Sequence, residues 1–321
     1  MAKPRVILTR RWPEEVERKL AAAFAVEFNG DDRALSESEL KDALQRADAV
    51  LPTVSDRLTA RLLEVEPLRT RILGNFGVGY NHIDLEAARA RGIVVTNTPG
   101  VLTDCTADLT LTLLLMVARR AGEGERELRA GRWRGWRPTH LLGTRVAGKT
   151  LGLIGMGRIG RAVARRAHHG FGMRVLAYNR SPLAAEELAA LGAEPCASLE
   201  ELLVQSDFVS LHCPGGQGPV LDAARLALMK PSAFLINTAR GDVVDEAALS
   251  EALQRRAIAG AGLDVYAAEP RVPEALMRLD NVVLLPHLGS ATHETRVAMG
   301  MRVLHNLEAF FAGRTPPDRV A

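Results

Sequence analysis

Three side chains of complementary chemistry, Arg240, Glu269 and His287, follow apolar, strand-like runs in the second half of the sequence. A guanidinium can hold a carboxylate through two parallel hydrogen bonds, and an imidazole can protonate a carbonyl oxygen while hydride reaches the carbon. A glutamate beside the imidazole would orient the ring and favour its protonated form. These residue types together suit the reduction of a 2-oxo acid.

Each of the three residues also has an ordinary structural interpretation. Arg240 could pair with a neighbouring acid, Glu269 could cap a helix or lie in solvent, and His287 could be a loop histidine with satisfied hydrogen bonds. Ligands of open α/β sheets bind at the carboxyl ends of the strands, where all three residues are expected. We therefore expect them to act together.

A cofactor for this chemistry could bind upstream, where an apolar run ends in the spacing Gly155-x-Gly157-x-x-Gly160. The pattern predicts a buried strand, a tight turn and the start of a helix, whose unpaired N–H groups would face a pyrophosphate. A bare glycine triplet could equally serve packing, but a strand before it and a helix after it favour a dinucleotide. The expected cofactor contacts are Gly155, Met156, Gly157, Arg158, Ile159 and Gly160.

The choice between NAD and NADP depends on Asn179, Arg180 and Ser181, which end the next predicted strand about 20 residues after the fingerprint. A carboxylate there would hold the ribose 2′-hydroxyl of NAD and repel the 2′-phosphate of NADP. No carboxylate is present there. Instead, the three residues provide a guanidinium, an amide and a hydroxyl, all of which can donate hydrogen bonds to a phosphate. We expect NADP to be preferred, with NAD possible; alternatively Arg180 points into solvent and the site is indifferent.

The composition is that of a globular α/β protein. The 321 residues are 47% apolar and 25% charged, enough for two cores, and 41 basic against 38 acidic residues give no reason to expect a nucleic-acid or membrane partner. No signal peptide or spanning segment is evident, so a cytoplasmic protein is expected. Cys105, Cys196 and Cys213 are too few and scattered for a disulfide framework or a metal site, and we expect buried thiols.

Strand-like and helix-like runs alternate along the chain, which predicts two doubly wound parallel-sheet domains of the α/β class. A turn cluster places a boundary near residue 100, and the last strand-like run ends the second domain near 288. The final helix is expected to return to the first domain. We predict a substrate-binding domain of residues 1–100 and 289–321, with a Rossmann domain of residues 101–288 inserted in it.

Two further segments have more than one interpretation. Residues 121–146 are polar and glycine-rich yet contain Trp133 and Trp136, which favours an arm that packs on a partner subunit over a small local core. The glycine cluster at residues 75–80 could present backbone N–H groups to a small anion, or could be a loop that merely needs glycine dihedrals.

Long motifs along essentially the whole chain resemble those of the D-isomer-specific 2-hydroxyacid dehydrogenases. Within that family, the Val95–Asp104 run and the tryptophan segment are most similar to glyoxylate and hydroxypyruvate reductases. The motifs that carry the resemblance are Asn75–Asp84, Val95–Asp104, Thr106–Asp108, Gly148–Thr150, Asn237–Asp242, Gly262–Tyr266, Glu269–Pro270 and Pro286–Thr292.

The resemblance implies roles for individual positions. It assigns Arg240, Glu269 and His287 as the catalytic residues, and it places Trp136 in an arm that reaches the neighbouring subunit's active site. The segments that close over the substrate correspond to Val54, Gly77, Val78 and Gly79, with the loop amides on its carboxylate. The cofactor is implied to contact Thr106, Cys213, Pro214, Thr238, Ala239, Asp264, His287 and Gly289.

One loop departs from the family pattern. After Pro214 the family usually continues with a Leu-Thr segment, whereas this chain has Gly215-Gly-Gln-Gly-Pro219, so phosphate contacts from that loop are in doubt. We expect an NADPH-dependent homodimeric reductase of glyoxylate and hydroxypyruvate that forms D-2-hydroxy acids. The alternatives are 3-phosphoglycerate dehydrogenase or another D-2-hydroxyacid dehydrogenase and, from a different class, a cofactor-sensing regulator similar to the C-terminal-binding-protein corepressors.

Overall fold

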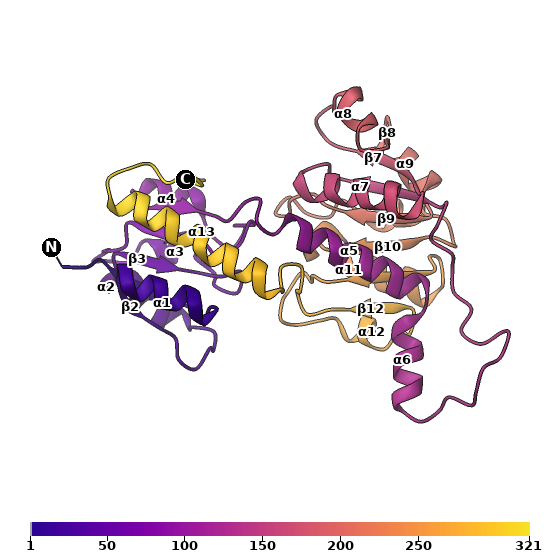
Figure 1. The fold of residues 1–321 in the computed structure, drawn as a ribbon, viewed down its shortest axis with the longest axis horizontal. Coiled ribbons are helices and arrows are strands. Elements are labelled where there is room, and N and C mark those ends of the chain that lie inside the picture. The colour runs from indigo at the N-terminus through magenta and orange to yellow at the C-terminus, as the bar shows by residue number, and fades with distance from the viewer. Residues whose placement is uncertain (1) are drawn as a thin grey trace. The chain divides into compact units, whose positions relative to one another are not determined.

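The computed structural model describes residues 2–321 and divides the chain into two compact units. The first unit contains residues 2–102 and 290–321, and the second is the continuous segment 103–289, which lies between them in the sequence (Figure 1). Each unit is built on its own sheet, one of five and one of seven strands, and every pairing between strands is parallel. The predicted α/β class is confirmed.

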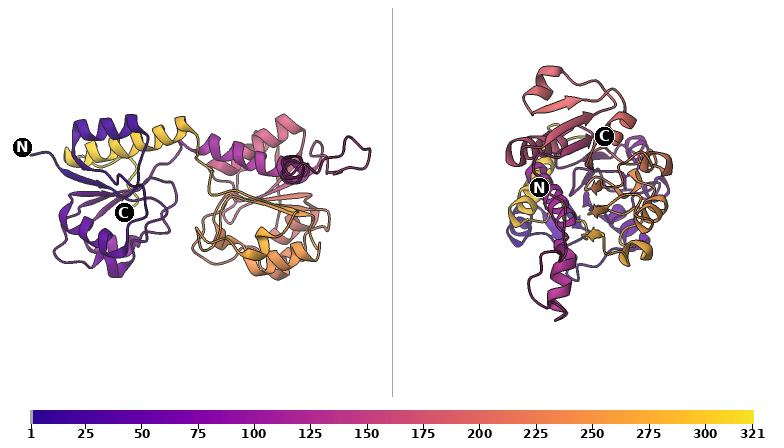
Figure 2. Two further views of the ribbon diagram at one scale, coloured as in Figure 1. Left: turned by 90° about the horizontal axis from the view of Figure 1, so that it is seen from below. Right: turned by 90° about the vertical axis from the view of Figure 1, so that its right-hand side faces the viewer.

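The sheet of the first unit has the order β2-β1-β3-β4-β5. Its strands are β1 (Arg5–Leu8), β2 (Ala25–Glu27), β3 (Ala49–Leu51), β4 (Ile72–Gly74) and β5 (Val94–Thr96). The helices are α1 (Glu14–Ala23), α2 (Glu37–Arg46), α3 (Ala60–Leu63), α4 (Leu85–Ala90) and α13 (His293–Phe311). Figure 2 shows α1 and α13 on one face of this sheet and the other helices on the opposite face.

Helix α13 is part of the first unit even though 196 residues of chain separate it from β5. A Cβ added to Gly74 in β4 would lie 2.7 Å from the side chain of Val303, and one added to Gly300 would lie 2.6 Å from Val16. The helix therefore contacts both β4 and α1 so closely that glycine is needed at each contact.

The sheet of the second unit has the order β12-β11-β10-β9-β6-β7-β8, which is the doubly wound dinucleotide-binding order extended by one strand. Its strands are β6 (Thr150–Ile154), β7 (Arg174–Tyr178), β8 (Ala193–Pro195), β9 (Phe208–Leu211), β10 (Phe234–Asn237), β11 (Gly260–Leu263) and β12 (Val282–Leu284). The helices are α5 (Thr103–Ala118), α6 (Ala121–Arg129), α7 (Arg158–Phe171), α8 (Ala185–Ala189), α9 (Leu199–Gln205), α10 (Ala223–Leu226), α11 (Glu246–Gln254) and α12 (Glu274–Met277), with a short 3-10 turn at Gly241–Val243.

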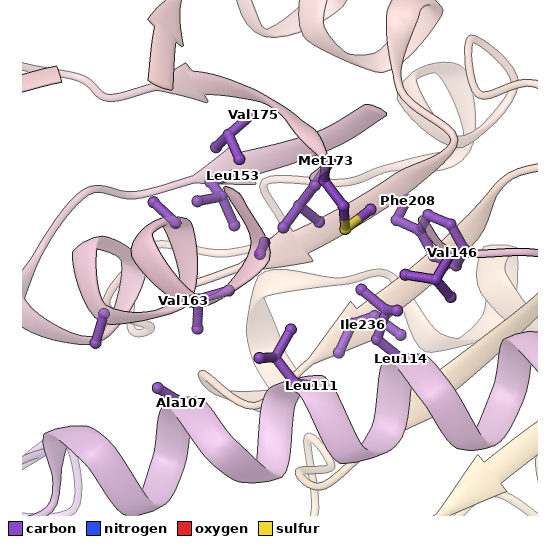
Figure 3. Close-up of a cluster of buried hydrophobic side chains, with 14 of the residues drawn as sticks. Ala107, Leu111, Leu114, Val146, Leu153, Val163, Met173, Val175, Phe208 and Ile236 are labelled. Atoms are coloured by element: carbon purple, nitrogen blue, oxygen red, sulfur yellow. The ribbon is translucent and has the colours of Figure 1, made fainter. Parts of the chain in front are cut away.

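Successive side chains of each strand point to opposite faces of this sheet, and helices cover both faces, so both sets of side chains are buried. On one face, Leu153 and Phe208 pack with Leu111 of α5 and Val163 of α7 (Figure 3). On the other face, Ile154 and Val209 belong to a second cluster with helices α9 and α11; its helical members include Leu199, Leu202, Leu203, Leu249 and Leu253. The near-continuous apolar character of these strands follows from this double burial.

Two expectations need correction at the level of local structure. The three cysteines are free but only half-buried, because each lies near the end of an element rather than in its middle. The edge strand β8 and the helix α8 before it have little apolar pattern and were not anticipated. Within residues 2–321, no helix combines the length and the apolar character needed to span a bilayer.

Candidate active site

The carboxyl ends of β10, β11 and β12 bring together the three residues singled out from the sequence. These strands are neighbours in the parallel sheet, so the segments that leave them meet at one edge. Arg240 follows β10, Glu269 follows β11 and His287 follows β12. His287 Nδ1 lies 2.8 Å from Glu269 Oε2, and the backbone N–H of Tyr266 donates to Glu269 Oε1 at 3.0 Å.

The Glu269 carboxylate is stabilised in its ionised form. Burial acts to raise its pKa, but the hydrogen bond and charge of His287 and the amide of Tyr266 outweigh burial and leave the pKa below its ordinary value. A carboxylate accepts only, so it holds a proton on His287 Nδ1. The other ring nitrogen, Nε2, is then the one available to exchange a proton with a ligand.

His287 adopts a left-handed backbone conformation, with φ of 56°, that costs a residue with a side chain about 1 kcal/mol. The buried carboxylate of Asp264 holds this turn, accepting from the amides of Leu288 at 2.6 Å and Gly289 at 2.8 Å. The carbonyl of Gly289 accepts from the hydroxyl of Thr106 at 2.9 Å. Asp264 and Thr106, predicted cofactor contacts, therefore also hold the backbone that carries the imidazole.

Arg240 is a half-buried guanidinium. Burial lowers its pKa, while the carboxylates of Glu269 and Asp242 act to raise it. Arginine stays protonated at neutral pH even so. The side chain of Asn237 closes the turn before it, donating to the carbonyl of Arg240 at 2.8 Å and accepting from the amide of Ala239 at 3.0 Å. Because the Arg240 guanidinium is partly shielded from water, its positive charge attracts an anionic ligand more strongly than a fully exposed charge would.

The glycine fingerprint has the geometry that a dinucleotide requires. Gly155 has φ of +99°, and a Cβ there would lie 2.7 Å from backbone atoms of His212. A Cβ on Gly160 would lie 2.2 Å from the carbonyl oxygen of Gly155, whereas one on Gly157 would meet nothing within 4 Å. Gly157 precedes α7 and provides no side-chain cap for the first amides of that helix. The loop thus offers open space and uncapped N–H groups to a pyrophosphate.

The residues after β7 connect the fingerprint with a second loop. The Asn179 side chain accepts from the amide of Met156 at 3.1 Å and donates to the carbonyl of Ser181 at 2.9 Å, so it holds the turn together. Arg180 is exposed and donates from Nη1 to Gln217 Oε1 at 3.1 Å. Gln217 lies in the unusual loop after β9 and was not among the predicted site residues, although the break in the family pattern there pointed to it.

The other predicted contacts of the nicotinamide half also lie at the strand ends of the second unit. Thr238 and Ala239 directly follow β10, and the hydroxyl of Thr238 lies 2.8 Å from that of Thr110 in α5. Cys213 and Pro214 follow β9, and burial raises the pKa of the Cys213 thiol. Arg158 and Ile159 form the first turn of α7 with Gly160.

The predicted substrate loop lies in the first unit, after β4. Asn75 donates to the carbonyls of Gly77 and Gly79, each at 3.0 Å, and its Oδ1 lies 3.0 Å from His82 Nε2. A Cβ on Gly77 would lie 3.6 Å from the side chain of Val54, which is exposed beyond β3. Four predicted residues, Val54, Gly77, Val78 and Gly79, are thus neighbours. The buried Asn75 ties the loop together; it was not among the predicted site residues, although it begins the motif Asn75–Asp84.

The segment after α6 has no core of its own around its tryptophans. Trp136 is 82% exposed and Trp133 is 52% exposed, and Leu128 and Leu142 are exposed as well. The interpretation as a local satellite core is therefore wrong for this chain.

An open, all-parallel sheet with a glycine fingerprint after its central strand and charged groups at its carboxyl edge defines a dinucleotide-binding α/β protein. Residues 111–289 match the model of the D-isomer specific 2-hydroxyacid dehydrogenase NAD-binding domain. The chain belongs to the D-isomer-specific 2-hydroxyacid dehydrogenase family.

Relatives of known name match over nearly the whole chain. A glyoxylate reductase of Thermococcus litoralis is 47% identical, with 99% of this chain and 97% of the relative covered. One of Pyrococcus furiosus is 46% identical over 99% of this chain and 95% of the relative. A crystal structure of an NADPH-dependent glyoxylate/hydroxypyruvate reductase of Sinorhizobium meliloti, in complex with NADP and malonate, is 38% identical with a TM-score of 0.87 and covers 100% of this chain and 97% of that one.

Proposed function

We propose that this protein reduces small 2-oxo acids, glyoxylate and hydroxypyruvate, to D-2-hydroxy acids with NADPH. The observation that carries the proposal is the His287–Glu269 pair, joined at 2.8 Å, at the same sheet edge as the half-buried guanidinium of Arg240. The names of the relatives support the substrate class. When bound, the nicotinamide supplies the hydride.

The chain's own residues divide the remaining work. Arg240 binds the substrate carboxylate through its planar fork. His287 gives the proton on Nε2 to the carbonyl oxygen, and Glu269 holds the ring by Nδ1 and stabilises its protonated form. Residues 1–100 and 289–321 act as the substrate-binding domain, and the loop of Gly77, Val78 and Gly79 after β4 is its substrate-binding segment. Residues 101–288 act as the cofactor-binding domain.

The proposed preference for NADPH rests on Arg180, which lies two residues after the end of β7. No carboxylate is present among the residues directly after this strand. A hydrogen bond to a charged group contributes roughly 1.5 to 3 kcal/mol, so one contact with the 2′-phosphate predicts an NADPH preference of about 10- to 150-fold in kcat/KM. Arg180→Ala is expected to remove most of it. Comparing kcat/KM for both cofactors in the two proteins checks this, and an alanine variant with unaltered selectivity would place the preference elsewhere.

A substrate panel with both nicotinamides tests the proposal as a whole. We expect turnover of glyoxylate and hydroxypyruvate. Turnover of 3-phosphohydroxypyruvate alone would identify the chain as a 3-phosphoglycerate dehydrogenase. Tight cofactor binding without turnover of any 2-oxo acid would favour a cofactor-sensing regulator instead.

The arm of residues 121–146 joins two copies of the chain, and Trp136 reaches the neighbouring subunit's active site. We expect the wild type to sediment as a dimer, because Leu128, Trp133, Trp136 and Leu142 leave a large apolar surface open to solvent. Placing a charge there, as in Leu142→Glu, should weaken the dimer at least about a hundredfold, since an unpaired charge buried in an interface costs several kcal/mol. Sedimentation velocity at micromolar concentration measures this.

The matched control is Leu228→Glu, which puts the same charge on an exposed leucine near α10, outside the arm. It should leave the sedimentation coefficient unchanged. A monomeric wild type at these concentrations, or equal dissociation by both variants, would contradict an interface formed by the arm.

A further inference from the structure

The loop Gly215–Pro219, which departs from the family pattern, is anchored to Asp242. The amide of Gly216 donates to the Asp242 carboxylate, and a Cβ on Gly215 would lie 2.2 Å from Asp242 Oδ1. Gly216 and Gly218 have φ of 90° and 82°, which favour glycine. Gln217 therefore directly follows a backbone position that is hydrogen-bonded to Asp242.

This loop and the segment after β7 approach each other beside the fingerprint. Strand β6 lies between β9 and β7, so the loops that follow β9 and β7 flank the one that follows β6. The fingerprint loop contacts both, since a Cβ on Gly155 would meet His212 after β9 and the amide of Met156 donates to Asn179 after β7. The Arg180–Gln217 hydrogen bond, at 3.1 Å, directly joins the loop after β7 to the loop after β9.

The chemistry of the two side chains determines which atom of Gln217 remains for a ligand. A guanidinium only donates, so the amide oxygen Oε1 must face Arg180 and the amide nitrogen Nε2 must point away from it. Within residues 2–321, Nε2 donates no hydrogen bond, and Gln217 is exposed. The pair therefore presents two neighbouring groups of donors, one charged and one neutral, on the side of the loops that faces solvent.

We infer that Gln217 is a specificity-determining residue for the phosphorylated dinucleotide. Its oxygen holds the guanidinium of Arg180 in place, and its Nε2 donates to the 2′-phosphate that Arg180 binds. A side chain already held loses less rotamer freedom on binding, which adds to selectivity for the phosphate. This inference rests on the proposed use of NADPH and assigns a role to the unusual loop.

The test measures the ratio of kcat/KM with NADPH to kcat/KM with NADH in the full-length protein. Gln217→Ala should lower this ratio about 10-fold, the lower end of the range for a hydrogen bond to a charged group, because Gln217 is exposed to water. Gln217→Glu should lower it at least about tenfold, because the carboxylate would neutralise Arg180 and repel the phosphate. As a second readout, the ratio of dissociation constants for 5′-AMP and 2′,5′-ADP, which differ by the 2′-phosphate alone, should fall in parallel.

The matched controls are Gln254→Ala and Gln254→Glu, at the exposed end of α11, which should leave both ratios unchanged. An NADPH-preferring wild type whose ratios stay the same in both Gln217 variants would overturn this inference and leave the proposed function standing. An NADH-preferring wild type would overturn the cofactor assignment and this inference together. Equal effects of the Gln217 and Gln254 variants would also overturn it, because the effect would then be a general one of charge or packing.

Discussion

Replacing His287 with asparagine is expected to lower kcat for glyoxylate about 10²- to 10⁴-fold, the usual contribution of a positioned general acid. Asparagine can keep a hydrogen bond to Glu269 and tolerates the left-handed backbone, where φ is 56°, better than most residues. It has no proton to give near neutral pH. The loss should therefore fall on turnover, and steady-state kinetics at saturating NADPH measures it.

Two measurements separate this result from damage to the fold. Dissociation constants for NADPH, obtained from its fluorescence, should stay close to those of the wild type. His305→Asn, at an exposed histidine of α13, should have no effect on kcat. Turnover of His287→Asn within a few-fold of the wild type would rule out this histidine as the proton donor.

Substitution of Arg240 should act on substrate binding. Arg240→Lys keeps the charge but cannot form two parallel hydrogen bonds, and we expect the KM for glyoxylate to rise about 10- to 150-fold, as for one charged hydrogen bond. Arg240→Gln removes both bonds and the charge, and an increase of about 10²- to 10⁴-fold is expected if the two contributions add. Initial rates over a wide range of glyoxylate concentrations distinguish the two variants.

The decisive result of this second experiment is a KM for glyoxylate that rises less in Arg240→Lys than in Arg240→Gln. The free energy of unfolding, measured in urea, should fall little in Arg240→Gln, because removing a buried charge also removes the cost of its desolvation. Arg225→Lys provides a control on an arginine that pairs with Glu200 at 3.1 Å away from this strand edge. An unchanged KM in both Arg240 variants would contradict a clamp on the substrate carboxylate.

The fold class could be predicted because buried parallel strands appear in the sequence as short apolar runs between helical patterns. Ala49–Leu51 is such an apolar run and forms β3, and the apolar-rich segment Thr103–Ala118 forms the long helix α5. β8 could not be predicted in this way. It is a three-residue edge strand, Ala193–Pro195, with two exposed residues, so it lacks the apolar signature of a central strand.

The positions of the chemically active residues could also be anticipated, since polar side chains directly after buried strands must lie at one sheet edge. The residues that hold these active side chains and their loops in place could not be predicted. Asp264 binds the amides of Leu288 and Gly289, and Gln217 binds Arg180, 37 positions away along the chain. Such contacts depend on the register of distant loops, which no local pattern of residue types encodes.

The return of residues 290–321 to the first unit has a consequence for how the chain reaches its native state. The amide of Val320 donates to the carbonyl of Val95 beside β5, and Val303 packs on Gly74. These pairings join positions more than 200 residues apart, so their loop-closure entropy is high and their formation is slow. During synthesis the continuous segment 103–289 emerges complete and can fold first, whereas the first unit must wait with part of its core exposed until residues 290–321 leave the ribosome.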